Sequence, residues 1–182
     1  MEKYYLSKEE AVLVVIDIQE KLVPVMSQKE KVIKNTNVLI SMAKSMDIPI
    51  IVTQQYSKGL GNTVPQIDEN LEGAMKFEKN TFSGCIEEVM DSLKKTGRKK
   101  VIITGMETHV CVFQSVRDLL KEGYNVFVAA DAVCSRTQEN YNNGLSMMQD
   151  MGAVISNTET ILFDMLKESG TPQFKALSKL IK

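Results

Sequence analysis

Cys111 is the residue of this sequence best placed for nucleophilic chemistry. It follows a predicted strand over 101–104 through Gly105-Met-Glu-Thr-His-Val, and a predicted helix over 110–122 begins beside it. Backbone N–H groups and the positive end of the helix dipole favour a thiolate there, so we expect a lowered thiol pKa. The same N–H groups could stabilise an oxyanion on a substrate carbonyl. The alternative is a small buried apolar residue, the commoner role of a cysteine.

Other cysteines and one histidine compete for roles in the same chemistry. Cys85 is the rival thiol, because it also lies near a predicted helix start, after Ser83-Gly84. Cys134 follows the predicted strand 126–130 by several residues and is expected to be structural. His109 stands two residues before Cys111, and helical residues two apart diverge by about 200°. We therefore expect His109 to line or support the pocket rather than to act as the base.

Asp17 and Lys79 are the candidates for a base and a compensating cation. Asp17 directly follows six apolar residues, Ala11-Val-Leu-Val-Val-Ile16. Desolvating a carboxylate there is costly unless it has a partner or a role, although capping of a helix near Gln19 is an alternative. Lys79, within Phe77-Glu-Lys-Asn-Thr-Phe-Ser83, could offset the charges of Asp17 and a thiolate. A solvated surface lysine is the alternative there.

The elements that must position these residues alternate between strands and helices. Continuous apolar runs predict strands covered on both faces, at 11–16, 48–53, 101–104, 126–130 and 153–156. Helical patterns lie between them, at 29–46, 84–96, 110–122 and 138–151, with Ser83 as an N-cap and Gly97 and Gly123 near the C-caps. This alternation predicts a doubly wound α/β fold. Ligands of such sheets bind at the carboxyl ends of strands where the strand order reverses, which selects the residues that follow each strand.

The stretch 54–79 is the one long segment without periodicity, and it contains three glycines and a proline. So long a connection is uncommon inside a domain and is often functional, and we expect a short strand near 75–77 within it. No repeat or linker is evident, so we expect residues 1–182 to form a single domain. The tail over 174–181 could form an amphipathic helix against the body or a neighbouring subunit.

Composition narrows the class of partner. The chain has 22 basic and 23 acidic side chains, a net charge of −1, which gives no surplus to bind nucleic acid or an anionic membrane. No apolar run approaches the roughly 20 residues of a membrane span, and the first residues lack the apolar core of a signal peptide. Three widely spaced cysteines fit a reducing cytoplasm, and a single histidine excludes a multi-histidine metal site within the chain. We therefore expect a small-molecule substrate and a cytoplasmic protein.

Three segments together resemble the isochorismatase-like cysteine hydrolase family. They are Ile16-Asp17-Ile18-Gln19, Lys79 before Phe82-Ser83, and Gly105-Met-Glu-Thr-His-Val-Cys111-Val, and the resemblance runs from about residue 8 to 165 in the order and spacing of the family. Two further segments look like the subgroup of isochorismatase-domain-containing proteins, namely Thr53-Gln-Gln-Tyr-Ser-Lys-Gly-Leu-Gly61 and Asp131-Ala-Val-Cys-Ser-Arg136.

The resemblance implies a three-layer α/β/α, Rossmann-like fold whose six-stranded parallel sheet has the order 3-2-1-4-5-6. It implies that Asp17 takes the thiol proton, that Lys79 holds the charges in place and that Cys111 attacks a carbonyl carbon to give an acyl-enzyme. It also implies a cis peptide between Met106 and Glu107, with the N–H groups of Glu107 and Cys111 turned toward the oxyanion. We expect the pocket to be lined by Gln19, Gln54, Tyr56, Phe82 and His109.

Departures from the family narrow the expected reaction. Its nicotinamidases bind a metal through an aspartate and two histidines after the second strand, where this chain has Gln54-Gln-Tyr-Ser57 and no histidine. Its isochorismatases proper break a vinyl ether and lack the cysteine. We therefore expect metal-independent and cofactor-independent hydrolysis of an amide or related C–N bond, by a homo-oligomer by analogy with the family. A non-catalytic binding protein and a redox-sensing thiol protein are the alternatives.

Overall fold

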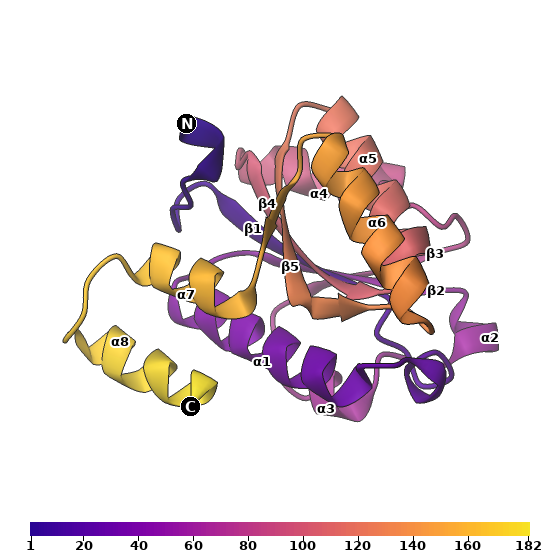
Figure 1. Cartoon of the computed structure of the whole chain (residues 1–182), viewed down its shortest axis with the longest axis horizontal. Helices are drawn as coiled ribbons and strands as arrows, with labels where there is room; N and C mark the ends of the chain where they lie inside the picture. The colour runs from indigo at the N-terminus through magenta and orange to yellow at the C-terminus, as the bar shows by residue number, and fades with distance from the viewer.

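The computed structural model describes the whole chain, residues 1–182, as a parallel sheet between two layers of helices (Figure 1). The strands lie in the order β3-β2-β1-β4-β5-β6, and every neighbouring pair is parallel. Their bounds are β1 Ala11–Ile16, β2 Ile50–Gln55, β3 Met75–Lys79, β4 Lys100–Met106, β5 Asn125–Cys134 and β6 Val154–Ser156. The predicted fold class and strand order are therefore confirmed.

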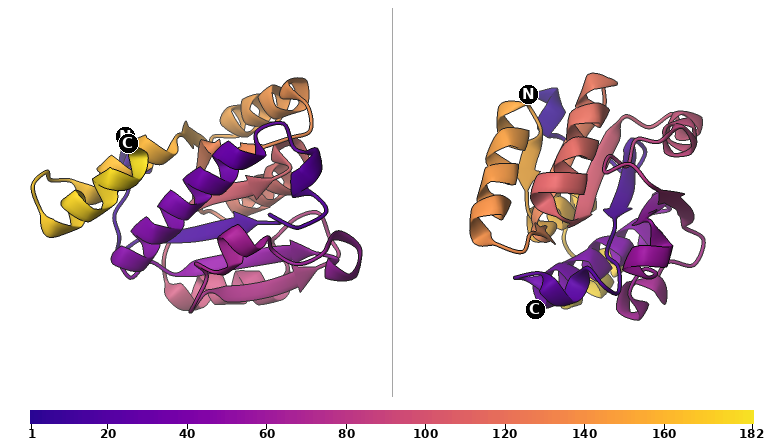
Figure 2. Two further views of the ribbon diagram at one scale, coloured as in Figure 1. Left: turned by 90° about the horizontal axis from the view of Figure 1, so that it is seen from below. Right: turned by 90° about the vertical axis from the view of Figure 1, so that its right-hand side faces the viewer.

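Helices cover both faces of this sheet. Their bounds are α1 Lys29–Ser45, α2 Ser57–Leu60, α3 Pro65–Asp68, α4 Glu87–Thr96, α5 Phe113–Lys121, α6 Gln138–Asp150, α7 Thr158–Leu166 and α8 Pro172–Leu177. Short 3₁₀ segments span Glu2–Tyr4, Val23–Val25 and Ser178–Ile181. The views agree that α4, α5 and α6 lie on one face and that α1, α3, α7 and α8 lie on the other, with α8 beside α1 (Figures 1 and 2).

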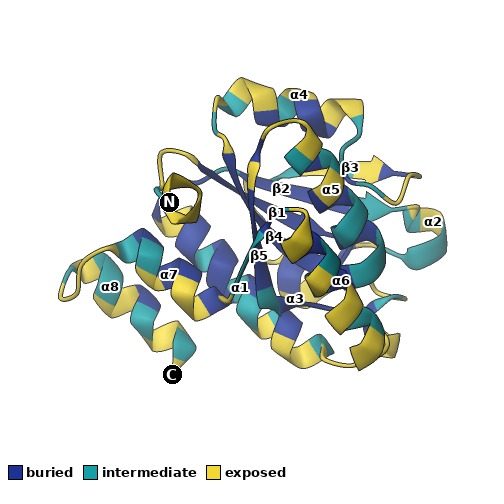
Figure 3. Cartoon of the chain, turned by 45° about the horizontal axis from the view of Figure 1, so that its top comes forward, coloured by how far each residue is buried: buried dark blue, intermediate teal, exposed yellow.

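Apolar burial holds the layers together. One cluster of 30 buried residues fills the α1 and α7 side of the sheet, and another of 19 fills the α4, α5 and α6 side. All residues of β1 and β4 are buried, as expected for the predicted strands at 11–16 and 101–104, and burial in β4 extends to Lys100. The helices bury the side that faces the sheet and expose the other (Figure 3).

None of the helices combines the length and the apolar composition that a membrane span requires.

The sheet order brings three strand ends together at one edge. Ile16, the last residue of β1, pairs with Thr53 of β2 on one side and with Gly105 of β4 on the other. Gly105 has φ +136, and a Cβ there would collide with the carbonyl oxygen of Ile16, so only glycine lets the two strands meet so closely. The segments after β1 and β4 therefore start side by side.

Several predicted boundaries differ from the structure. Helix α4 begins at Glu87 rather than 84, with Ile86 as its N-cap, so Ser83 does not cap it and Cys85 precedes it. Strand β3 occupies the predicted position near 75–77 but continues to Lys79. Helix α7 was not predicted, because its threonines and β-branched residues have weak helix propensity. Burial of its apolar side stabilises the helix instead.

Candidate active site

Asp17 is the first residue after β1, where the chain turns out of the sheet. Its φ of 52 turns the chain, while its backbone N–H still donates to the carbonyl of Thr53. The side chain is completely buried, and both carboxylate oxygens have partners. Oδ1 accepts from the Thr53 hydroxyl at 2.7 Å, and Oδ2 accepts from the Lys79 ammonium at 2.6 Å. The carboxylate is thus paired as burial of a charge requires, and it caps no helix.

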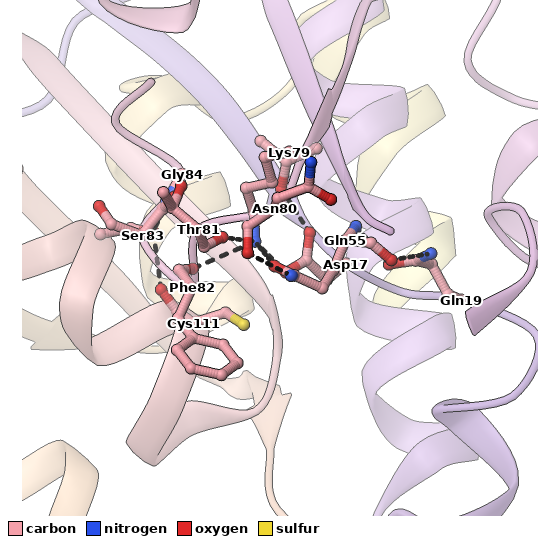
Figure 4. A network of polar contacts seen from close by, with 12 residues as sticks. Asp17, Gln19, Gln55, Lys79, Asn80, Thr81, Phe82, Ser83, Gly84 and Cys111 are labelled. Carbon is pink, nitrogen blue, oxygen red and sulfur yellow. Dashed lines mark hydrogen bonds and ion pairs between the residues drawn. The ribbon is translucent and has the colours of Figure 1, made fainter. Parts of the chain in front are cut away.

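Lys79 ends β3 and turns its ammonium inward. The side chain has no solvent exposure, so the alternative of a solvated surface lysine is wrong. Besides Asp17, its Nζ donates to the side-chain oxygen of Gln55 at 2.7 Å and to the carbonyls of Thr81 and Phe82, each at 3.1 Å (Figure 4). Four oxygens surround the cation, and only one of them carries a formal charge.

Cys111 lies in a π-helical turn, Thr108–Val112, immediately before α5. The Ser115 hydroxyl donates to its carbonyl at 2.6 Å and accepts from the Gly84 N–H at 2.7 Å, which joins the loop after Lys79 to the cysteine-bearing turn. On the other side, Gly144 of α6 packs against this turn, where a Cβ would come within 3.0 Å of its backbone. Packing from two elements therefore fixes the cysteine.

The pKa of the Cys111 thiol is raised, contrary to the lowered pKa expected from a helix start. Burial raises its pKa to about 12, the Asp17 carboxylate adds to the rise, and the Lys79 ammonium opposes it. The expectation failed because the turn is buried, and desolvation outweighs the local helix dipole. A neutral thiol beside a carboxylate can still react if the carboxylate takes its proton during attack.

Cys85 provides a comparison for this environment. Burial raises the pKa of its thiol to about 11, but the charges that act on it belong to Asp118, Glu122 and Arg117. Its sulfur donates to the carbonyl of Ser115. Cys85 therefore has neither the carboxylate nor the ammonium that faces Cys111. Cys134 is buried at the end of β5, and burial raises its pKa to about 12.

The peptide bond between Met106 and Glu107 is cis, as the resemblance implies. Met106 is completely buried, and Glu107 is 8% exposed. The Glu107 carboxylate accepts from the backbone N–H and the Nε of Arg136, both at 3.1 Å. This pairing directs the side chain of Glu107, four residues before Cys111, toward the segment that follows β5.

The expected pocket residues separate into different environments. Gln19 is completely buried and bonds the backbone of Gln55, so it supports the site rather than lining it. Gln54 donates to the hydroxyl of Thr63 at 3.0 Å, away from Lys79. Successive strand residues point to opposite faces, and it is Gln55 that reaches the ammonium.

The two aromatic candidates and His109 lie closer to solvent. Tyr56 and Phe82 are 53% and 55% exposed, and each belongs to a segment that contacts Lys79 through its backbone. His109 is half-buried, and its Nδ1 lies 2.9 Å from the hydroxyl oxygen of Ser135. His109 is thus held by Ser135, the residue after β5, and is not bonded to Cys111.

Thr53 and Gln55 are site residues that sequence reasoning missed. Both lie at the carboxyl end of β2, which the predicted strand order sets beside β1. Polar residues at that end of a buried strand were therefore a signal that could have found them.

No three His, Cys, Asp or Glu side chains come together in the arrangement that a metal ion would need.

Most of the chain is similar to known proteins. Residues 11–160 match the isochorismatase domain. A secreted isochorismatase effector, Isc1, of Phytophthora sojae is 42% identical over 177 residues, which are 94% of this chain and 84% of that protein. Isochorismatase domain-containing protein 2 of Danio rerio is 37% identical, covering 97% and 89%. The structure of a MAR1 ribonuclease from Caenorhabditis elegans matches with a TM-score of 0.93 and 39% identity, covering 97% and 92%.

Proposed function

The chain belongs to the isochorismatase family and has its hydrolase fold, and we propose that it hydrolyses an amide or related C–N bond of a small molecule through an acyl-enzyme on Cys111. The observation that carries this proposal is the buried pair of Asp17 and Lys79, 2.6 Å apart, whose charges both act on the Cys111 thiol. A base, a cation and a nucleophile in one dry site are the parts that covalent acyl transfer needs.

In the first half of the reaction, the thiol proton moves to the Asp17 carboxylate as the Cys111 sulfur bonds to the substrate carbonyl carbon. The carbonyl becomes an oxyanion, which we assign by family resemblance to the N–H groups of Glu107 and Cys111. The oxyanion collapses, the C–N bond breaks, and the amine leaves with the proton from Asp17. A thioester on Cys111 remains.

In the second half, Asp17 takes a proton from water, and the resulting hydroxide adds to the thioester carbon. The C–S bond breaks, the acid product leaves, and the sulfur regains its proton from Asp17. Lys79 keeps its charge throughout and offsets whichever negative charge stands beside it, on Asp17 or on the sulfur. The one histidine of the sequence, His109, is bonded to Ser135 and not to Cys111. This supports Asp17, rather than a histidine, as the base.

Burial of the site favours a small substrate. Asp17 and Lys79 have no exposed side-chain surface, and Cys111 is only 6% exposed. The name of the C. elegans relative raises RNA as a second candidate substrate. A polymer phosphodiester would have to reach the same buried sulfur, and a chain with a net charge of −1 offers it no general attraction. We therefore favour the small amide.

Ammonia release from a panel of primary amides, ureas and carbamoyl compounds tests this proposal. We expect wild type to release ammonia from at least one compound, Cys111→Ala to release none, and Cys85→Ala to behave as wild type. The same preparations are incubated with single-stranded RNA. Equal ammonia release by Cys111→Ala would exclude the covalent route, whereas RNA cleavage that depends on Cys111 would favour the second candidate.

The alternatives without turnover make different forecasts for the same proteins. A non-catalytic binding protein leaves every compound of the panel intact. A redox-sensing protein does so too, but its Cys111 is oxidised by dilute peroxide while Cys85 is not. The predicted single domain, cytoplasmic location and homo-oligomer stay predictions, and sedimentation equilibrium tests the last.

A further inference from the structure

The Lys79 ammonium has a neutral partner placed as closely as its charged one. The side-chain oxygen of Gln55 lies 2.7 Å from Nζ, nearly as near as Asp17 Oδ2 at 2.6 Å. The carbonyls of Thr81 and Phe82 are farther away, at 3.1 Å. Three ammonium protons serve four acceptors, so the two short bonds set the position of the nitrogen. Gln55 is thus one of the two groups that fix where the cation sits (Figure 4).

The amide of Gln55 is held in one orientation. Its Nε2 donates to the carbonyl of Asn80 at 2.9 Å, which leaves the oxygen to face Lys79. The opposite orientation would bring an NH₂ group against the ammonium and leave the Asn80 carbonyl facing an oxygen. The acceptor is therefore prepared before any substrate arrives.

The backbone of Gln55 is fixed in turn by Gln19. The Gln55 N–H donates to the Gln19 side-chain oxygen at 2.7 Å, and Gln19 Nε2 donates to the Gln55 carbonyl at 3.0 Å. The same Nε2 also donates to the carbonyl of Gly61 at 2.7 Å. Regular β1–β2 pairing ends at Ile16 and Thr53, so the Gln19 amide takes over where the β1 backbone has turned away.

We infer that Gln55, supported by Gln19, is a positioning residue that fixes the Lys79 ammonium beside Asp17 and Cys111 without adding a negative charge. The inference rests on the proposed function for its role in turnover. The effect of Gln55 on the pKa of the Cys111 thiol, through Lys79, does not depend on that function. A carboxylate at this position would offset part of the charge of Lys79, which is the charge that opposes the rise in the Cys111 pKa. A neutral acceptor does not offset the charge of Lys79, so the full charge acts to stabilise the Cys111 thiolate.

Alkylation of Cys111 by iodoacetamide tests this inference independently of any substrate. Only the thiolate reacts, so at a fixed pH below the thiol pKa the rate constant follows the thiolate fraction. Rates are measured between pH 7 and 9 in a Cys85→Ala background, with peptide mass mapping to identify the modified cysteine. The variants are Gln55→Glu, Gln55→Met, Lys79→Met and the pair Gln55→Met with Lys79→Met.

We expect Gln55→Glu to slow alkylation by about tenfold, which corresponds to a rise of one pKa unit. Gln55→Met, which removes the acceptor without adding charge, should slow it by about threefold because the ammonium loses its fixed position. Added to Lys79→Met, it should change nothing further, because Gln55 acts through Lys79. Gln66→Glu adds the same charge at an exposed site on α3 and should leave the rate unchanged.

A Gln55→Glu rate within twofold of the Cys85→Ala background would overturn the inference, as would an equal effect of Gln55→Met with and without Lys79. If Gln55→Glu does not fold, the Gln55→Met cycle decides alone. Failure of these outcomes removes the role of Gln55 and leaves the proposed hydrolase in place. Failure of the amide panel with these outcomes intact removes the hydrolase and leaves the electrostatic arrangement.

Discussion

The Nζ atom of Lys79 lies 2.6 Å from Oδ2 of Asp17, and neither side chain has any exposed surface. The two residues come from strands on opposite sides of β2, and their contact spans the end of that strand. From β2, the Thr53 hydroxyl donates to the other oxygen of Asp17, Oδ1, and the Gln55 side-chain oxygen accepts from the same Nζ. Cys111 follows β4, which lies on the other side of β1. The site therefore combines residues from four neighbouring strand ends.

Replacing Asp17 by asparagine separates its two effects on Cys111. Its carboxylate raises the thiol pKa, so Asp17→Asn should lower that pKa and speed iodoacetamide alkylation at pH 8 by at least about threefold. Any amide turnover should fall by a factor of about 10²–10⁴, because the proton acceptor is lost. Quenched alkylation with mass mapping, and ammonia release, measure the two quantities. Slower alkylation in the variant would show that Asp17 does not oppose the thiolate.

The buried pair also makes a forecast about stability. Lys79→Met leaves the Asp17 carboxylate buried without its counter-charge and should lower the free energy of unfolding by about 3–5 kcal/mol. Asp17→Asn should cost a similar amount, because it leaves the buried Lys79 ammonium with neutral partners only. The double variant, Asp17→Asn with Lys79→Met, should lose less unfolding free energy than the two single variants lose together. Urea unfolding followed by circular dichroism measures all three, and additive losses would mean that the pair is not coupled.

Gly105 should tolerate no side chain. A methyl group there meets the Ile16 carbonyl, and the positive φ adds strain, so Gly105→Ala should destabilise the fold by about 3 kcal/mol or more. Gly73→Ala is the matched control, because Gly73 has φ +82 but no atom within 4 Å of the place that a methyl group would take. It should lose only about 1–2 kcal/mol. Similar losses at both sites in urea unfolding would show that β1 and β4 can separate at this point.

The strand ends were the part of the site most accessible from sequence. The apolar runs that end at Ile16 and Thr104 predict buried parallel strands, and a polar residue after such a strand stands where ligands bind. This reasoning led to Asp17 and Cys111. Lys79 required the family resemblance, because a lysine at the close of a long segment without periodicity gives no local sign that it points inward.

The properties that depend on several elements at once escaped prediction. The thiol pKa of Cys111 is governed by burial, which the local helix pattern does not reveal. Residues 83–86 read as the start of a helix, but bonding of Gly84 to Ser115 of α5 keeps them outside it. The contact of Gln55 with Lys79 needs the register of β2 with β3, where Gln55 pairs with Lys79.

Acyl transfer from p-nitrophenyl acetate is the most direct test of the proposed nucleophile, because this ester acylates a competent sulfur whatever the natural substrate is. Acid-quenched protein is digested and the acetylated residue is located by mass spectrometry. We predict an acetyl group on Cys111 in wild type and in Cys85→Ala, and none in Cys111→Ala. Acetylation of Cys85 alone, or release of p-nitrophenol at an unchanged rate by Cys111→Ala, would contradict the account.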